Sequence, residues 1–247
     1  MADVQSAGLE WTVLTWNIHG TKSTDVQRVA EVIEVAAPDV VALQEVRRPQ
    51  ADELAERLAM TAFWTEKHHP WRPLFPSWAE GAAVLTPHRL RESDSVRVSD
   101  VGRKRSYRRR IAQWTVVERA DGAAYRVFNL HLSPHDLHEQ RRREATYVSE
   151  IARTVGDAPP QIVAGDFNDQ DDPGIIGLLP GIEAIAPPPT NPANAPDRSI
   201  DHVLVPSESR SVSASVPAGG VDWARLSDHL PLTLRFTLDW VRNGFGN

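Results

Sequence analysis

Chemically active side chains stand at the ends of short apolar segments throughout this sequence of 247 residues. Each of these segments leads to a carboxylate, an amide or an imidazole. The residues in these positions are Asn17, Glu45, His131, Asp166 with Asn168, Asp201, and Asp228 with His229. Short apolar segments are typical of buried β-strands, and side chains at strand ends can converge on one rim of a sheet. The pattern therefore predicts a single site rich in oxygen and nitrogen donors.

A rim of this composition suits a hard divalent cation and a phosphate ester. Mg²⁺ takes oxygen ligands, commonly one or two carboxylates, with water and phosphate completing its shell. During hydrolysis of a phosphate ester, such a cation neutralises charge, lowers the pKa of bound water and stabilises the departing oxygen. We therefore expect Mg²⁺ as the cofactor, with Mn²⁺ able to substitute for it, and a phosphate ester as the substrate.

The segments that end in acids and amides allow specific roles. Glu45 in VVALQEV follows a buried strand, where it could bind the metal or be an ordinary solvated residue. Asn17 in LTWNIHG could hold a phosphate oxygen or a carboxylate, although asparagine after a strand is often only a turn residue. In IVAGDFND, Asp166 could take a proton from water and Asn168 could orient that water; the structural alternative is an Asx turn.

The histidines are expected to act with carboxylate partners. Asp201 in SIDHVLV is assigned as the partner of His229 in LSDHLPL, because a carboxylate orients an imidazole and stabilises its cationic form. Asp228 then faces the metal. His131 in VFNLHLSP is expected at the phosphate, with Glu80 as its orienting partner, or else is a satisfied core histidine.

Taken in order, these motifs resemble the endonuclease/exonuclease/phosphatase superfamily, which includes deoxyribonuclease I-like and exonuclease III-like metal-dependent hydrolases. They span residues 11–236. The resemblance implies an α/β fold, a four-layer α/β/β/α sandwich in which two mixed β-sheets pack face to face with helices outside. It also implies metal contacts at Glu45, Asn17 and Asp228, and catalytic roles for His131, Asp166, Asn168, Asp201 and His229.

Two positions depart from the superfamily pattern or divide its branches. Ala82 stands where many members have asparagine, which removes a polar group near the expected site. At His131 the abasic-site enzymes usually carry tyrosine, so histidine favours the deoxyribonuclease and phosphodiesterase branches.

The remaining pattern predicts alternating strands and helices in one domain over residues 1–247, with flexible ends at 1–10 and 242–247. The proline- and alanine-rich segment 184–196 is expected to be a surface loop. Helices are expected at 24–37, 52–60 and 137–155, and strands at 11–16, 40–43, 82–85, 111–118, 125–132, 161–164, 200–205 and 230–236.

A basic stretch, RKRSYRRR at residues 103–110, precedes one of the expected strands. A solvated loop is the ordinary interpretation of a charge run. Basic residues with an interleaved aromatic also fit polyanion binding, so Tyr107, Arg109 and Arg110 are candidate substrate contacts. A nucleic acid, an inositol phosphate or a phospholipid head group would each be attracted.

Composition limits the remaining classes of function. A net charge of −6 argues against a protein that coats nucleic acid by charge alone, but not against a nuclease whose bound cation reverses the local field. The absence of cysteine excludes disulfides, thiolate chemistry and zinc–sulfur sites. No signal peptide or membrane span is visible, so we expect a cytoplasmic protein, and a monomer.

Three functions follow as hypotheses. The first is Mg²⁺-dependent hydrolysis of phosphodiester bonds in DNA or RNA. The second is a phosphatase or phosphodiesterase of small molecules or lipids, of the inositol phosphate or sphingomyelin type. The third is a catalytically silent binding protein on the same fold, which the full set of candidate residues disfavours.

Overall fold

The computed structural model describes residues 9–22, 24–69, 76–100, 106–169, 173–217 and 221–238. The strands are β1 (Leu9–Asn17), β2 (Val40–Arg47), β3 (Thr61–His68), β4 (Glu80–Thr86), β5 (Arg89–Arg97), β6 (Ile111–Glu118), β7 (Ala124–His131), β8 (Gln161–Asp166), β9 (Asp201–Leu204), β10 (Arg210–Ser215) and β11 (Leu232–Leu238). The helices are α1 (Val26–Ala36), α2 (Arg48–Arg57), α3 (His138–Val155), α4 (Pro173–Ile176) and α5 (Trp223–Leu226), with 3₁₀ turns at Gly20–Lys22, Pro76–Trp78 and His135–Leu137.

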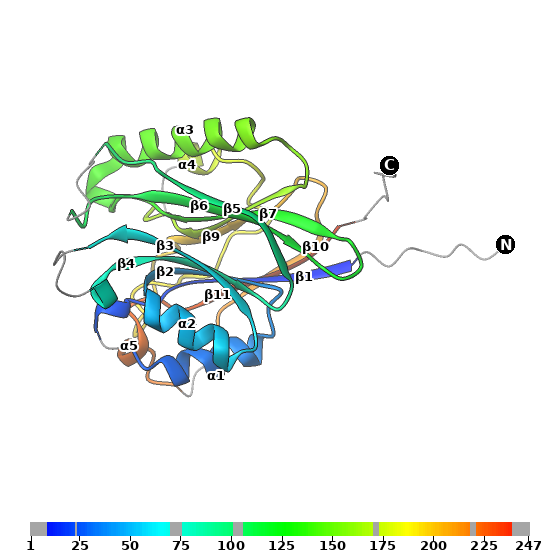
Figure 1. The fold of residues 1–247 in the computed structure, drawn as a ribbon. Coiled ribbons are helices and arrows are strands. Elements are labelled where there is room, and N and C mark those ends of the chain that lie inside the picture. The colour runs from blue at the N-terminus through cyan, green and yellow to red at the C-terminus, as the bar shows by residue number, and fades with distance from the viewer. Residues whose placement is uncertain are drawn as a thin grey trace.

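Two mixed sheets form the centre of the molecule. The six-stranded sheet has the order β10-β11-β1-β2-β4-β3, and the five-stranded sheet has the order β5-β6-β7-β8-β9. The pairs β1–β2 and β7–β8 are parallel, and the other pairs are antiparallel. Helix α3 covers the outer face of the five-stranded sheet, while α1 and α2 cover the six-stranded sheet (Figure 1). The four-layer α/β/β/α sandwich expected from the sequence is confirmed.

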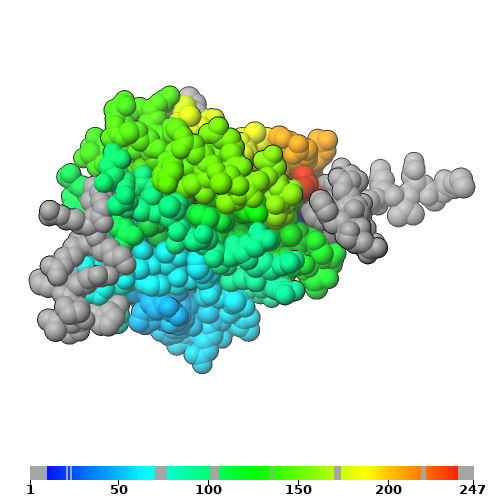
Figure 2. All heavy atoms as spheres, turned by 45° about the horizontal axis from the view of Figure 1, so that its top comes forward, coloured from blue at the N-terminus to red at the C-terminus, as the bar shows by residue number. Residues whose placement is uncertain are grey.

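The outer helices follow their sequence patterns. In α1 the buried residues Val29, Ala30 and Ile33 face the sheet, and the Asp25 side chain caps the helix by accepting the Arg28 N–H. Helix α2 begins four residues before its predicted start at 52, because Pro49 suits the first turn of a helix. Figure 2 shows the side chains of α3, in yellow-green, spread over their sheet.

The space between the sheets changes from apolar to polar along every central strand. Side chains that face the same side of a strand recur every two residues, so one inward row can be followed along each strand. These buried rows run Trp11, Val13, Thr15, Asn17 on β1; Val40, Ala42, Gln44 on β2; Tyr125, Val127, Asn129, His131 on β7; and Ile162, Ala164, Asp166 on β8. The apolar end is the core, and the polar end holds the candidate site.

Three strands, β3, β5 and β10, were not predicted from the sequence, and each lies at the edge of its sheet. Strands β5 and β10 are largely exposed and have few apolar residues, Leu90 and Val96 on β5 and Val212 and Ala214 on β10. Strand β3 is mostly half-buried and shows no alternation of apolar and polar residues. Across the described ranges, no helix is long and apolar enough to cross a membrane.

Candidate active site

Asp166 lies at the centre of the site, at the end of β8. The preceding residue, Gly165, has φ 152°, and a Cβ there would meet the Leu130 carbonyl oxygen at 2.0 Å, so only glycine lets β8 approach β7 this closely. The Asp166 side chain accepts hydrogen bonds from Asn17 Nδ2 at 3.1 Å and from the Asn168 backbone N–H at 2.9 Å. Burial raises the pKa of Asp166 to about 6.

Two imidazoles flank this carboxylate. His131 is paired in register with Asp166 across β7 and β8, and its Nε2 lies 3.6 Å from Asp166 Oδ2. His229 Nε2 lies 3.8 Å from the same oxygen, on the side of the six-stranded sheet. The polar inward rows of both sheets therefore meet at one carboxylate.

The structure brings Asp201 and His229 together as a buried pair. His229 Nδ1 lies 2.8 Å from Asp201 Oδ2, which also accepts the Thr190 hydroxyl at 2.5 Å. Burial opposes protonation of His229, but the charges of Asp201 and Asp166 outweigh it and raise the pKa of His229 to about 10. The imidazole is therefore a cation at neutral pH.

Glu45 lies at an irregularity in the pairing of β2 with β4. The β2–β4 register shifts between Gln44 and Val46, and Glu45 has φ 53°, so its side chain departs from strict strand alternation. Its carboxylate lies 3.9 Å from His131 Nε2 and is 22% exposed. In the part of the chain that the structure describes, no group donates a hydrogen bond to it. A largely buried carboxylate without a donor fits a divalent cation.

A second group of potential ligands suits a cation less well. The ligand atoms of Asp166, Asp201 and His229 all lie within 4.8 Å of one another. His229 is protonated, however, and its Nδ1 is held by Asp201, whereas an imidazole that binds a metal must be neutral. The donor set therefore favours a cation on the Glu45 side.

Asp228 has a partner that the sequence patterns did not reveal. Its Oδ1 lies 2.9 Å from His19 Nδ1, and the backbone N–H of His19 donates to Asn17 Oδ1 at 3.1 Å. The hydrogen bond between the His19 and Asp228 side chains raises the pKa of His19 and lowers that of Asp228. Asp228 is 52% exposed at the rim, in contrast to the buried Asp166. The position of His19 within LTWNIHG, beside Asn17, was the available signal.

The predicted pairing of Glu80 with His131 is corrected by the structure. Glu80 accepts a hydrogen bond from Lys67 Nζ at 2.5 Å and lies 3.5 Å from His68 Nδ1, both on the neighbouring strand β3. Strand β3 was not predicted from the sequence, so Lys67 was not considered as a partner for Glu80. Among the described residues, the carboxylates within 4 Å of His131 are Glu45 and Asp166 instead.

This arrangement leaves His131 neutral. Burial lowers its pKa well below the ordinary value, and the charges of Arg110 and Lys67 lower it further. Burial also lowers the pKa of His68 to about 4. The His131 side of the site thus combines neutral imidazoles with two buried cations.

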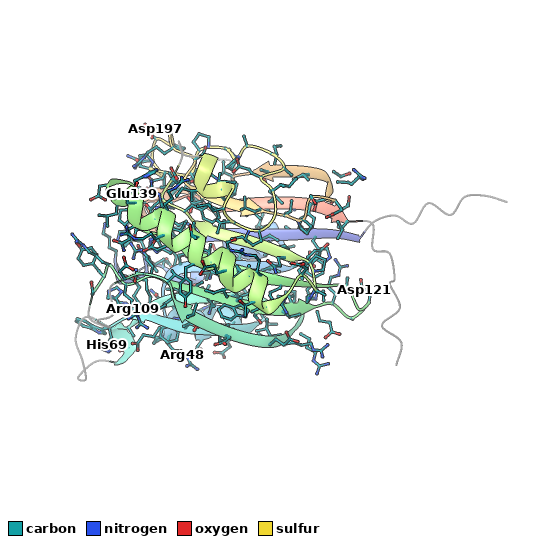
Figure 3. All side chains as sticks on the ribbon, turned by 90° about the horizontal axis from the view of Figure 1, so that it is seen from above. Arg48, His69, Arg109, Asp121, Glu139 and Asp197 are labelled. Carbon is teal, nitrogen blue, oxygen red and sulfur yellow. The ribbon has the colours of Figure 1, made fainter. Side chains whose placement is uncertain are left out.

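The basic stretch divides into a buried and an exposed part. Arg110 is buried, and its guanidinium donates to the Leu132 carbonyl at 3.1 Å and the Tyr107 carbonyl at 2.9 Å. The Tyr107 ring is 62% exposed, and Arg108 Nε donates to its hydroxyl at 3.2 Å. Residues 103–105 lie outside the described ranges. Figure 3 places Arg109 and His69 at the same end of the molecule, opposite Asp121 in the β6–β7 turn.

Asn168 ties the two central strand ends together. Its backbone has φ 53°, and its Nδ2 donates to the Leu132 carbonyl at 3.0 Å, while its backbone N–H binds Asp166. One side-chain N–H is used in this bridge, which leaves its amide oxygen available. Of the predicted residues, Asn17 and Asn168 hydrogen-bond to Asp166, and His131 and His229 lie 3.6 and 3.8 Å from it. Asp201 is connected to it through His229.

Two sheets with this site at one end define a known class of protein. The sequence matches the Endonuclease/Exonuclease/phosphatase family over residues 14–229, and the chain belongs to this family. The family's enzymes hydrolyse phosphate esters and typically depend on a divalent metal, and the Glu45 side of the site offers a carboxylate that such an ion could bind.

Individual relatives cover almost the whole chain. The uncharacterized protein YbhP of Escherichia coli is 24% identical over 257 residues, covering 95% of this chain and 99% of that protein. An endonuclease/exonuclease/phosphatase from Bacteroides vulgatus superposes with a TM-score of 0.74 at 22% identity, covering 94% of this chain and all of that one. A mannosyl-6-phosphatase from Bacteroides thetaiotaomicron gives 0.70 at 19% identity over 92% and 100% of the chains. These likenesses show the fold.

Proposed function

We propose that this protein is a divalent-metal-dependent phosphodiesterase that acts on DNA or RNA. The observation that carries the proposal is the convergence of Asn17, His131 and His229 on the buried carboxylate of Asp166. A proton acceptor, a cation and hydrogen-bonding groups then lie within one small site, which is what hydrolysis of a phosphate ester requires.

Mg²⁺, or Mn²⁺ in its place, is the cofactor that this donor set fits. Glu45 would hold it, with Asn17 and Asp228 at its margin, since Mg²⁺ binds through few carboxylates and keeps several waters. The bound cation supplies charge neutralisation at the phosphate and makes water more acidic.

Asp166 is proposed to accept the proton from the attacking water. With a pKa raised to about 6, the carboxylate is ionised at neutral pH and is still a stronger base than an ordinary aspartate. Asn17 fixes one of its oxygens, and the Asn168 N–H fixes the other. His229 is a poor candidate for this role, because its pKa of about 10 keeps it protonated.

The remaining residues stabilise negative charge. The His229 imidazolium, oriented by Asp201, faces the oxygen of Asp166 and would stabilise charge that develops on the phosphate. His131 is neutral and would donate or accept a hydrogen bond to the phosphate, together with the amide of Asn168. Each contribution comes from a side chain whose orientation is fixed by a hydrogen bond or by burial.

The preference for nucleic acid rests on the exposed end of the basic stretch. Tyr107 is exposed and is paired with Arg108, so an aromatic ring and a guanidinium group are available to a polyanion. Arg110 connects this segment to the Leu132 carbonyl, one residue beyond His131. Base stacking combined with phosphate contacts is a common way to bind nucleic acid strands.

A second candidate is a phosphatase of small molecules or lipids. The buried guanidinium of Arg110 on the His131 side favours it, because a cation there would suit the greater charge of a phosphate monoester. The mannosyl-6-phosphatase with the same fold shows that such a substrate is compatible with the architecture.

Substrate panels separate the candidates. Purified protein with Mg²⁺ is offered plasmid, single-stranded DNA and RNA, and in parallel inositol phosphates, sugar phosphates and sphingomyelin. Cleavage of a nucleic acid, abolished by EDTA, supports the nuclease. Phosphate or phosphocholine release with all nucleic acids intact selects the second candidate, and inactivity on every substrate with no Mg²⁺ binding indicates a silent binding protein.

A further inference from the structure

Three amide side chains connect the two sheets beneath the candidate site. Gln44 of β2, Gln113 of β6 and Asn129 of β7 are all fully buried, between the apolar core and the polar end of the sandwich. Gln44 Nε2 donates to Asn129 Oδ1 at 2.7 Å, which joins the six-stranded sheet directly to the five-stranded sheet. No part of the proposed chemistry uses these residues.

The connection is made in both directions. Asn129 Nδ2 donates back to the Leu43 and Ala83 carbonyls at 3.0 Å each and to Gln113 Oε1 at 3.2 Å. Gln113 Nε2, from the same sheet as Asn129, donates to the Phe63 carbonyl at 2.8 Å and to the Ala82 carbonyl at 3.2 Å. Strands β2, β3 and β4 of one sheet are therefore hydrogen-bonded to β6 and β7 of the other.

At the site the sheets are joined by the Asn17–Asp166 hydrogen bond and the His229–Asp201 pair, and in the core they meet through apolar side chains. Such packing excludes water but is not directional, and cores tolerate rearrangement of apolar side chains while keeping the fold. Hydrogen bonds between buried amides are directional and are costly to leave unmade, so they fix one separation and one register of the sheets. The amides thus impose a geometry that the apolar core alone does not impose.

Their place in the chain couples them to the site. Gln44 immediately precedes Glu45, and it is paired in register with Asn17 on β1. Asn129 stands two residues before His131, on the same face of β7, and His131 is in register with Asp166. A shift of one sheet against the other would move Glu45 and Asn17 relative to His131 and Asp166.

We propose that Gln44, Asn129 and Gln113 are positioning residues for the reaction, which hold the two halves of the site at the separation that the chemistry needs. This inference rests on the proposed function, since it assigns a role in the same site. The amides do not touch the substrate; they act through Glu45, Asn17, His131 and Asp166. Displacements of about 1 Å at a reacting centre can cost on the order of 100-fold in rate.

The test compares variants that separate positioning from stability. Asn129→Leu removes the amide at similar volume. In the double variant Gln44→Met/Asn129→Leu both members of this pair become apolar, so the Gln44 amide is no longer left unpaired. The Leu43 and Ala83 carbonyls lose the same donor in both variants. Val127→Ala is the matched control, because Val127 faces the same space two residues earlier on β7 and belongs to the apolar core.

The free energy of unfolding of each variant is obtained by urea denaturation. Two further measurements report on the site: kcat and KM for bis-p-nitrophenyl phosphate with Mg²⁺, and the imidazole ¹⁵N resonances of His131 and His229 in metal-free protein. For Asn129→Leu and for the double variant we expect kcat to fall about tenfold or more with KM nearly unchanged, and the resonances to move. For Val127→Ala we expect lower stability with kcat and resonances kept.

The inference is overturned if the double variant regains stability and kcat together, or if Asn129→Leu behaves like Val127→Ala in both measurements. Failure of the proposed function has a different signature. Wild-type protein would then hydrolyse no phosphate ester. The positioning role would be judged from the ¹⁵N resonances of His131 and His229 alone: resonances that move in Asn129→Leu support it, and unchanged resonances contradict it.

Discussion

His229 and Asp201 form a buried ion pair with Nδ1 and Oδ2 2.8 Å apart, although they come from segments separated by 28 positions in the chain. The pairing fixes which ring nitrogen points at Asp201 and leaves Nε2 directed toward Asp166. The negative charge of Asp201 is also a principal reason that His229 is protonated. Orientation and charge therefore have the same source.

Replacement of Asp201 by asparagine should remove the charge and keep the shape. We expect kcat to fall by about 10²–10³-fold, because His229 is then less often the cation that stabilises the phosphate charge. KM for a diester should change much less. Steady-state kinetics with Mg²⁺ measure both constants, and a kcat within about threefold of wild type would contradict the role of the pair.

The same pair predicts how stability depends on pH in metal-free protein. The folded-state pKa of His229 is about 10, above its unfolded value of 6.5, so the stabilisation is complete below pH 6.5 and is lost as the pH rises toward 10. Asp166, with a pKa of about 6, still titrates at the lower end of this interval, so the loss due to His229 is read above about pH 7.5. Urea denaturation in EDTA should show this loss in wild type and a smaller one in Asp201→Asn; equal slopes would argue against it.

Lys67 and Glu80 should behave as a buried pair whose members depend on each other. Both side chains are at most 7% exposed. Lys67→Met leaves the Glu80 charge without its cation, and we expect a loss of about 3–5 kcal/mol in the free energy of unfolding. Lys67→Met/Glu80→Gln should recover most of it.

The control for that series is Arg91→Met, which breaks the more exposed ion pair with Glu118. It should cost at most about 1 kcal/mol. Chemical denaturation of the four proteins decides the matter. A Lys67→Met loss no larger than that of Arg91→Met would show that the buried pair does not have this dependence.

Gly165 should tolerate no side chain. In Gly165→Ala the new Cβ would approach the Leu130 carbonyl oxygen to 2.0 Å, so β7 and β8 must separate just before Asp166. We expect a loss of about 3 kcal/mol or more. Gly122→Ala is the matched control, because its φ is also positive, at 88°, with open space around the Cβ, and it should cost only about 1 kcal/mol. Equal effects would contradict the close-approach argument.

Much of the site could be predicted because each short apolar segment of the sequence ends in a carboxylate, an amide or an imidazole. His131 and Asp166 are the last residues of two buried strands that pair in register. Apolar residues at alternate positions earlier in each strand identify these strands in the sequence. The fold followed from the same motifs. Prediction failed where the pattern was weak: the mostly half-buried β3 shows no alternation, so Lys67 was overlooked and Glu80 was assigned to His131.

The amide connection was hidden for a different reason. A buried Gln or Asn between apolar neighbours has no sequence signature of its own, and its partners are far apart in the chain: Gln44 and Asn129 are separated by 85 positions. Only the packing of one sheet on the other brings them together. His19 and Asp228 are separated by 209 positions and are brought together within one sheet, where β1 pairs with β11.

The most direct test of the central claim is hydrolysis of bis-p-nitrophenyl phosphate by wild type, Glu45→Ala, Asp166→Ala and His229→Ala. Each protein is assayed with Mg²⁺, with Mn²⁺ and with EDTA, and its fold is checked by circular dichroism. We expect metal-dependent hydrolysis by wild type, abolished by EDTA and reduced at least about 100-fold in each folded variant. Activity that persists in EDTA, or in folded Asp166→Ala at the wild-type rate, would contradict it.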